Sequence, residues 1–137
     1  MFFYKEINRM FVHIIEIICI CAFALSAVIS EVNKGKDIIS VLVLGWVTAL
    51  GGGTVRDVIL STDQVFWIQY PSYFWAALFS SLIGFFIAPQ LRKLKAERLI
   101  LVLDAIGISI FSILVTKKMI HQDYAAYVAI TMGTITA

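Results

Sequence analysis

The stretch that decides the fold reads Gly51-Gly52-Gly53-Thr54-Val55-Arg56-Asp57 and lies inside a long apolar segment, not at its end. The apolar run at 38–50 would form a helix of only about 20 Å, because each helical residue adds about 1.5 Å. A bilayer core is about 30 Å thick, so a span that begins there must continue through the glycines to about residue 60. Three glycines at about 1 kcal/mol each, and charges at about 2.5–3.5 kcal/mol, are too costly for a plain membrane anchor. We therefore predict that this second span is a broken helix, since broken helices occur in lipid where transporters and channels hold their ions.

A break would place polar backbone groups at membrane depth without full charges. The first half-helix would end in free carbonyl groups, which can replace the hydration water of a cation, and the second would begin with free N–H groups. The alternative role for the glycines is the close crossing of two helices. The predicted lining of this pore or substrate site consists of Gly51, Gly52, Gly53, Thr48 and Thr54.

Two charged residues, Arg56 and Asp57, follow about one helical turn beyond the glycines. We interpret them as a partly buried ion pair that supports the second part of the helix. The alternative is that the charges lie at a pore mouth and act on the ions directly. The two roles differ in whether loss of Arg56 changes stability or ion preference.

Composition indicates an integral membrane protein. Hydrophobic residues make up 61% of the 137 residues, charged residues make up 15%, and the mean hydropathy is +0.92, which is too apolar for an ordinary soluble domain. The net charge of +2 is small and scattered, so it indicates no nucleic-acid partner. The sequence contains no nucleophile–base arrangement, cofactor loop or metal-ligand spacing, and we expect neither an enzyme nor a metal or cofactor site.

Hydropathy predicts an all-α, polytopic helical membrane protein. Pro71 suits the first turn of the third span, and Pro89 suits its end. A basic loop at 90–98 favours the cytoplasmic side, which places the N-terminus outside after three crossings of the lipid bilayer. The predicted spans cover about 10–30, 38–60, 72–88, 99–116 and 124–137.

An acidic residue, Glu16, lies within the first span. Together with Glu6, Arg9 and His13 it forms a polar stripe on one helix face, because these residues are three or four positions apart. We interpret His13 and Glu16 as an interfacial pair that satisfies itself beside neighbouring helices. The alternative is a role in lining or gating an ion path, since an ionisable residue at membrane depth is a functional candidate.

A second acidic residue, Asp104, aligns with Glu16 in an internal repeat. The same offset of 88 residues pairs Phe23 with Phe111, and a Gly-x-x-Thr-Ala pattern at 45–49 with the same pattern at 133–137. Residues 1–89 then form a first three-helix repeat, and residues 99–137 form the start of a second. Because three spans reverse the direction of entry, the two units would be inverted repeats, as in many transport proteins.

Two parts of the sequence resemble the bacterial trimeric intracellular cation channel family, also known as the UPF0126 or glycine transporter domain family. One is GGGTVRD at 51–57 with the Val65-Phe66-Trp67 and Pro71 that follow it. The other is the first span, with Glu16-Ile17-Ile18-Cys19 and Phe23-Ala24-Leu25-Ser26, where Cys19 and Ala27 replace glycines that the family usually has. The resemblance covers essentially the whole chain from about residue 16.

The resemblance implies a potassium-permeable pore within each subunit of a homotrimer in the bacterial inner membrane. The family's other label implies instead a glycine carrier, in which N–H groups of a half-helix would hold the substrate carboxylate and the acids its ammonium group. A membrane assembly subunit without transport activity is the third possibility.

The repeat also leads us to expect that the chain is incomplete. The offset places the partners of the three glycines immediately beyond Ala137, and the mapping lacks a sixth span. We therefore expect the reading frame to continue with a glycine-rich motif resembling GGG-x-x-RD. We also expect the 137-residue chain alone to insert poorly and to conduct nothing.

Overall fold

The computed structural model describes residues 2–32, 35, 37–93 and 97–137, and these residues form helices, turns and short connections. No strand occurs within those ranges, so the predicted all-α membrane class is confirmed. The helices are α1 (Phe2–Val32), α2 (Ile38–Ile59), α3 (Phe66–Gln69), α4 (Pro71–Lys93), α5 (Glu97–Ile120) and α6 (Ala126–Thr136).

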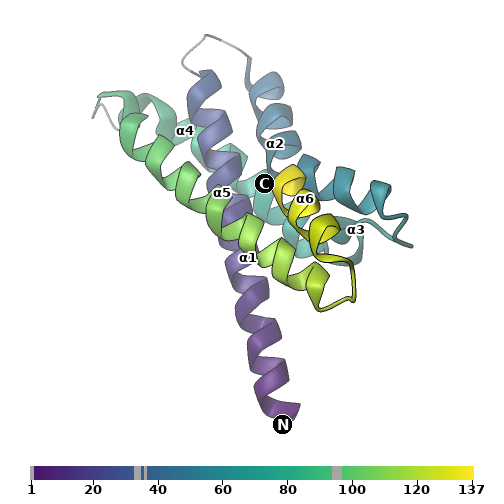
Figure 1. Ribbon diagram of the computed structural model, residues 1–137. Helices are drawn as coiled ribbons and strands as arrows, with labels where there is room; N and C mark the ends of the chain where they lie inside the picture. The colour runs from purple at the N-terminus through teal and green to yellow at the C-terminus, as the bar shows by residue number, and fades with distance from the viewer. Residues whose placement is uncertain (1, 33–34, 36, 94–96) are drawn as a thin grey trace.

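The long helix α1 is the centre of the arrangement, because α2, α4 and α5 all pack against it (Figure 1). The short helix α6 lies against the end of α5 and also contacts α2. The core between α1 and α5 contains the edge-to-face pair of Phe23 and Phe111, whose ring centroids are 5.7 Å apart. Segments far apart in the sequence therefore meet around the middle of α1.

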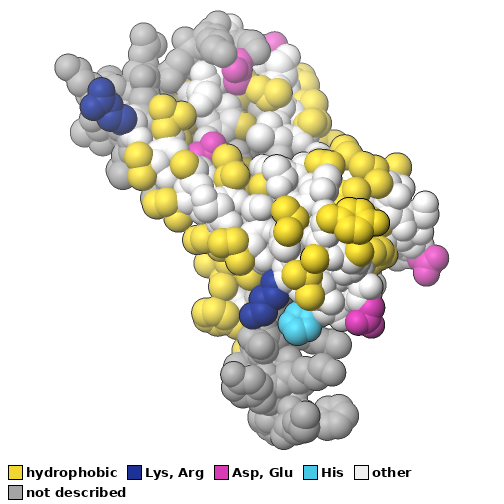
Figure 2. All heavy atoms as spheres, in the orientation of Figure 1, with side chains coloured by type: hydrophobic (Ala, Val, Ile, Leu, Met, Phe, Trp, Pro, Cys, Tyr) yellow, Lys and Arg dark blue, Asp and Glu magenta, His cyan; other side chains and the backbone are white. Residues whose placement is uncertain are grey.

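Four helices are long and apolar enough to cross a membrane, with candidate spans Met10–Val32, Ile38–Ile59, Pro71–Leu91 and Ile100–Ile120. Less than two fifths of each span is buried within the chain. Apolar side chains accordingly cover much of the face in Figure 2, and charged side chains are few there. This surface suits contact with lipid or with further protein. Helix α6, at 11 residues, is shorter than a membrane span.

Several predicted boundaries differ from those in the structure. Pro89 does not end the third span, because α4 continues to Lys93 with the proline inside it. A proline removes one backbone donor, and membrane helices tolerate this loss. The basic loop predicted at 90–98 is correspondingly shorter: residues 90–93 belong to α4 and 97–98 to α5, while 94–96 lie outside the described residues. The short helix α3 was not predicted.

The predicted break in the second span is wrong, because α2 runs as one helix through all three glycines to Ile59. The glycines instead permit close contact, which was the alternative role. A Cβ atom added to Gly52 would lie 2.2 Å from the backbone oxygen of Thr136, and one added to Gly53 would lie 2.4 Å from the Phe66 ring. Neighbouring segments thus approach the helix more closely than any side chain would allow. The energetic cost of the glycines is offset by this packing.

The start of α2 is fixed by an N-cap. Asp37 accepts hydrogen bonds from the Ser40 backbone N–H at 3.2 Å and from the Ser40 hydroxyl at 2.8 Å. These hydrogen bonds hold the pKa of the exposed Asp37 carboxyl below its usual value. The cap explains why the helix begins at Ile38, where the apolar run also begins.

Candidate functional site

The sequence after the glycines builds a compact corner between α2 and α3. We call the set Gly53, Thr54, Arg56, Asp57, Phe66 and Trp67 the α2–α3 corner. Its charged members form a buried pair, with side chains 10% and 6% exposed. The Arg56 Nε–H donates to Asp57 Oδ1 at 2.8 Å, and the other carboxylate oxygen of Asp57 accepts the Phe66 backbone N–H at 2.8 Å.

The same aspartate also organises the chain between the two helices. Its backbone carbonyl accepts hydrogen bonds from both the N–H and the hydroxyl of Thr62, at 3.1 and 3.2 Å. The Arg56 guanidinium lies over the Phe66 ring, 5.6 Å from its centroid, which is within the range of a cation–π interaction. The ion pair therefore joins α2 to α3.

The remaining members of the corner complete the attachment of α3. The Thr54 hydroxyl donates to the Leu50 carbonyl at 2.8 Å and accepts the Trp67 indole N–H at 3.0 Å. The Phe66 ring occupies the space that a side chain at Gly53 would need. The motif at 53–57 and the aromatic residues at 66–67 are thus one packing unit.

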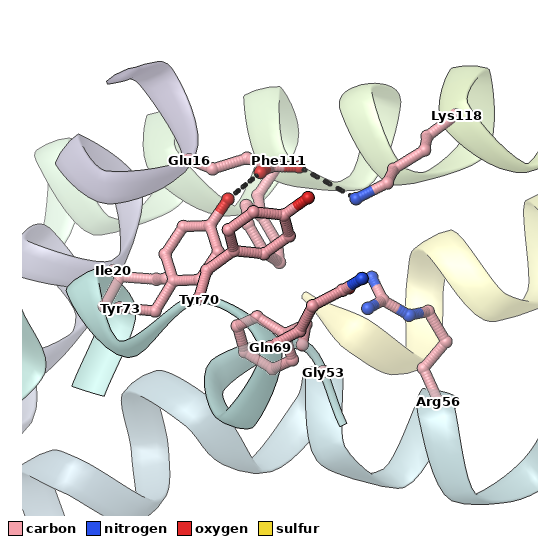
Figure 3. Close-up of a pocket in the computed structure, with 10 residues that line it drawn as sticks. Glu16, Ile20, Gly53, Arg56, Gln69, Tyr70, Tyr73, Phe111 and Lys118 are labelled. Atoms are coloured by element: carbon pink, nitrogen blue, oxygen red, sulfur yellow. Dashed lines mark hydrogen bonds and ion pairs between the residues drawn. The ribbon is translucent and has the colours of Figure 1, made fainter. Parts of the chain in front are cut away.

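A second polar group lies across from this corner. We call the set His13, Glu16, Tyr73 and Lys118 the Glu16 cluster; its members come from α1, α4 and α5. Figure 3 shows Glu16, Tyr73 and Lys118. The Tyr73 hydroxyl donates to Glu16 Oε2, and His13 Nδ1 lies 2.7 Å from the same hydroxyl. Glu16 Oε1 lies 3.7 Å from Lys118 Nζ. The expected pair of His13 and Glu16 is therefore mediated by Tyr73.

The two groups line one small cavity of about 50 Å³. Figure 3 shows Glu16 and Lys118 on one wall, with Arg56 and Gln69 facing them. A carboxylate, an ammonium and a guanidinium thus surround a space large enough for a water molecule or a small ion. A larger cavity of about 350 Å³ adjoins it, and Arg56, Gln69 and Lys118 line both.

The structure brings some of the predicted site residues together and separates others. Glu16, Gly53 and Arg56 line the small cavity, and Asp57 lines the larger one. Thr48 is exposed on the outer face of α2, and Asp104 lies half-buried in α5 outside both cavities. Gly51, Gly52 and Thr54 also lie outside both cavities.

The polar lining residues that were missed from the sequence are Gln69, Tyr70, Tyr73 and Lys118. Neither Tyr73 nor Lys118 belongs to a sequence pattern that predicts a site. The unpaired acid Glu16 was the available signal, because a buried carboxylate needs a donor or a cation from another helix. The sequence did not indicate which helix supplies it.

Comparisons with known proteins agree with this fold. Residues 13–89 match the family described as Glycine transporter. The chain is 35% identical over 127 residues to the UPF0126 inner membrane protein YadS of Escherichia coli K12. The alignment covers 93% of this chain and 61% of the relative. It is 37% identical over 125 residues to a UPF0126 membrane protein of Vibrio cholerae, covering 90% of this chain and 52% of the relative.

The fold is also similar to solved structures of trimeric intracellular cation channels. A trimeric intracellular cation channel orthologue from Rhodobacter sphaeroides is 33% identical, with a TM-score of 0.79 over 91% of this chain and 63% of that chain. A prokaryotic channel of the same kind, solved in 0.5 M KCl, is 25% identical, with a TM-score of 0.82 over 93% of this chain and 65% of that chain. The chain spans less than two thirds of the length of these proteins.

Proposed function

We propose that this chain, which belongs to the glycine transporter (UPF0126) family, forms part of a monovalent-cation channel of the trimeric intracellular cation channel type. The observation that carries the proposal is the likeness to the Rhodobacter sphaeroides channel orthologue, at 33% identity over most of this chain. The buried carboxylate of Glu16 in a polar cavity between helices is consistent with a cation path.

Potassium is the proposed permeant ion, and a homotrimer in the bacterial inner membrane is the proposed assembly. The named relatives support the membrane, since one of them is described as an inner membrane protein. The exposed apolar spans leave ample surface for subunit contacts. An outside N-terminus follows from the basic residues of 90–98 and from Lys34 and Lys36, two residues that lie outside the described ranges.

We further propose that the 88-residue offset reflects an inverted repeat. One packing contact recurs at this offset. The Cβ position of Gly45 meets Val28, and the equivalent Cβ position of Gly133 meets Thr116, the offset partner of Val28. Phe23 and its offset partner Phe111 contact each other directly. Equivalent residues touch in this way when a two-fold axis passes between them. These contacts support two units related by such an axis, and α6 then corresponds to residues 38–48, the first half of α2.

A glycine carrier is the second candidate, and one observation favours it. The small cavity combines a carboxylate, Glu16, with the cations Arg56 and Lys118. A zwitterion needs both signs of charge, so its ammonium group would lie at Glu16 and its carboxylate at the two cations. A membrane assembly subunit without transport is the remaining alternative.

Reconstitution of the protein encoded by the complete reading frame separates these candidates, and all transport measurements proposed below use that protein. We expect unitary currents in planar bilayers bathed in potassium salt, at rates of about millions of ions per second. Saturable glycine uptake into matched liposomes, without unitary currents, would replace the channel by the carrier. Absence of both signals from correctly inserted protein would contradict any transport function.

A further inference from the structure

The hydrogen bonds of the Glu16 cluster specify where its protons lie. A tyrosine hydroxyl carries a single proton, and Tyr73 gives it to Glu16. Toward His13 the Tyr73 oxygen must therefore act as acceptor, so Nδ1 of His13 carries a hydrogen. In the neutral ring the other nitrogen, Nε2, then holds a lone pair, and the Ser72 hydroxyl lies 3.4 Å from it.

A proton can be added to this ring without breaking the chain of hydrogen bonds. Protonation at Nε2 leaves the Nδ1–H bond to Tyr73 in place, and the Ser72 hydroxyl can turn to accept. Ser72 is exposed and His13 is only half-buried, so the chain itself does not enclose the free nitrogen. Histidine is the side chain that changes its charge between about pH 5 and 8.

Aromatic and acidic side chains surround the His13 ring. Among the described side chains, the titratable groups that face it are Tyr70, Tyr73 and, through the Tyr73 hydroxyl, Glu16. The ring centroids of Tyr70 and His13 are 5.7 Å apart, within the range at which aromatic faces attract cations. Two described cations lie beyond Tyr73: Lys118 on α5 contacts the far oxygen of Glu16, and Arg56 on α2 lines the same cavity.

We propose that His13 is a proton-binding site coupled through Tyr73 to Glu16, so that binding of a proton weakens cation binding at the Glu16 carboxylate. The coupling is electrostatic: one hydroxyl group separates the imidazole from the carboxylate. A positive charge at that distance opposes a second cation at Glu16. The ligand is the proton itself, and acid pH on the side of His13 lowers transport.

The first test does not need transport. The chain contains two histidines, His13 and His121, so ¹⁵N-histidine labelling gives two ring systems to follow by NMR in detergent or nanodiscs. The ring signals of His13 are followed between pH 8 and 5.5. In the Glu16→Gln variant the pH dependence of these signals should differ from that of the unmodified protein, because the negative charge is removed. His121 lies in the exposed turn after α5, and the pH dependence of its signals should not change.

The second test rests on the proposed cation transport. Potassium flux into liposomes should fall several-fold between pH 8 and 5.5 in the unmodified protein and in His121→Gln. The flux of His13→Gln should be independent of pH over this range, and Tyr73→Phe should show a reduced pH dependence because the connecting hydroxyl is lost.

The outcomes distinguish the two proposals. A pH dependence of the His13 signals that is the same with and without the Glu16 charge would overturn the coupling, whether or not the protein transports ions. An unchanged pH profile in His13→Gln would overturn it too. Normal coupling in the NMR titration together with no potassium flux at any pH would instead reject the proposed channel and keep the proton site.

Discussion

The α2–α3 corner and the Glu16 cluster face each other across one cavity but differ in how their charges are satisfied. In the corner, Asp57 accepts hydrogen bonds from Arg56 and from the Phe66 backbone, and both charged side chains are buried. In the cluster, Glu16 shares its carboxylate between Tyr73 and a Lys118 side chain that is 47% exposed. The charges of the α2–α3 corner are satisfied by residues close in sequence, whereas Glu16 is satisfied by residues from helices far apart in sequence, one of them partly exposed.

The α2–α3 corner supports the fold, whereas the proposed function rests on the Glu16 cluster. The corner contains the residues that stood out in the sequence, yet its hydrogen bonds are used to dock α3 on α2. The Glu16 cluster contains two such residues, His13 and Glu16, and two others, Tyr73 and Lys118, that have no local signature. Strong motifs can therefore mark the scaffold of a site, while the adjustable charges lie opposite it.

The largest expected effect is the loss of stability in Asp57→Ala. This change leaves the Arg56 guanidinium buried without its partner and the Phe66 N–H without an acceptor, and removal of one member of a buried pair costs about 3–5 kcal/mol. Thermal and denaturant unfolding in detergent measure it. The double variant Arg56→Ala with Asp57→Ala should recover part of the loss, because no charge is then left unpaired.

The matched control for this change is Asp63→Ala, since Asp63 is an exposed acid in the same connection between α2 and α3. We expect it to unfold like the unmodified protein. Equal stability of Asp57→Ala and Asp63→Ala would show that the corner is not held by its ion pair, and the contrast with the Glu16 cluster would disappear.

An intermediate effect is expected at the glycines, and it differs between neighbours. A Cβ atom at Gly52 would lie 2.2 Å from the Thr136 backbone oxygen, whereas one at Gly51 would meet only Val47, at 3.9 Å. Gly52→Ala should therefore destabilise the protein by about 1–3 kcal/mol through overpacking against α6. Gly51→Ala should be neutral or stabilising by up to about 1 kcal/mol, because alanine favours the helix.

Unfolding measurements on the two alanine variants test this order directly. If Gly51→Ala were as damaging as Gly52→Ala, the glycines would serve a bend in α2 and not its contact with α6.

The smallest effect on stability is expected for Glu16→Gln. The amide oxygen can still accept the Tyr73 hydroxyl, and the lost ion pair involves a half-exposed lysine, so the cost should be below about 1 kcal/mol. Potassium flux should nevertheless fall, because the buried negative charge is removed. A variant as unstable as Asp57→Ala, with unchanged flux, would place Glu16 in the scaffold and reverse the comparison.

The sequence by itself determined the class of the protein and most of its helices. Long apolar runs can satisfy their backbone groups in lipid only as helices, so the second span was predicted at 38–60 and is observed at Ile38–Ile59. Pro71 begins α4 as expected, since the first turn of a helix needs no N–H there. The adjacent residues Arg56 and Asp57 were also predicted to pair, and they do.

Only the tertiary structure decided how the glycines and the acids are used. A glycine weakens a helix by about 1 kcal/mol. Whether the helix bends at the glycine depends on what packs against it, and at Gly52 that neighbour is Thr136 on α6. Likewise Glu16 needed a donor, and the chain placed Tyr73 there from 57 residues away. Local rules fix where helices form, because their hydrogen bonds are local. Which polar groups meet depends on how the helices pack, and hydropathy carries no information about that.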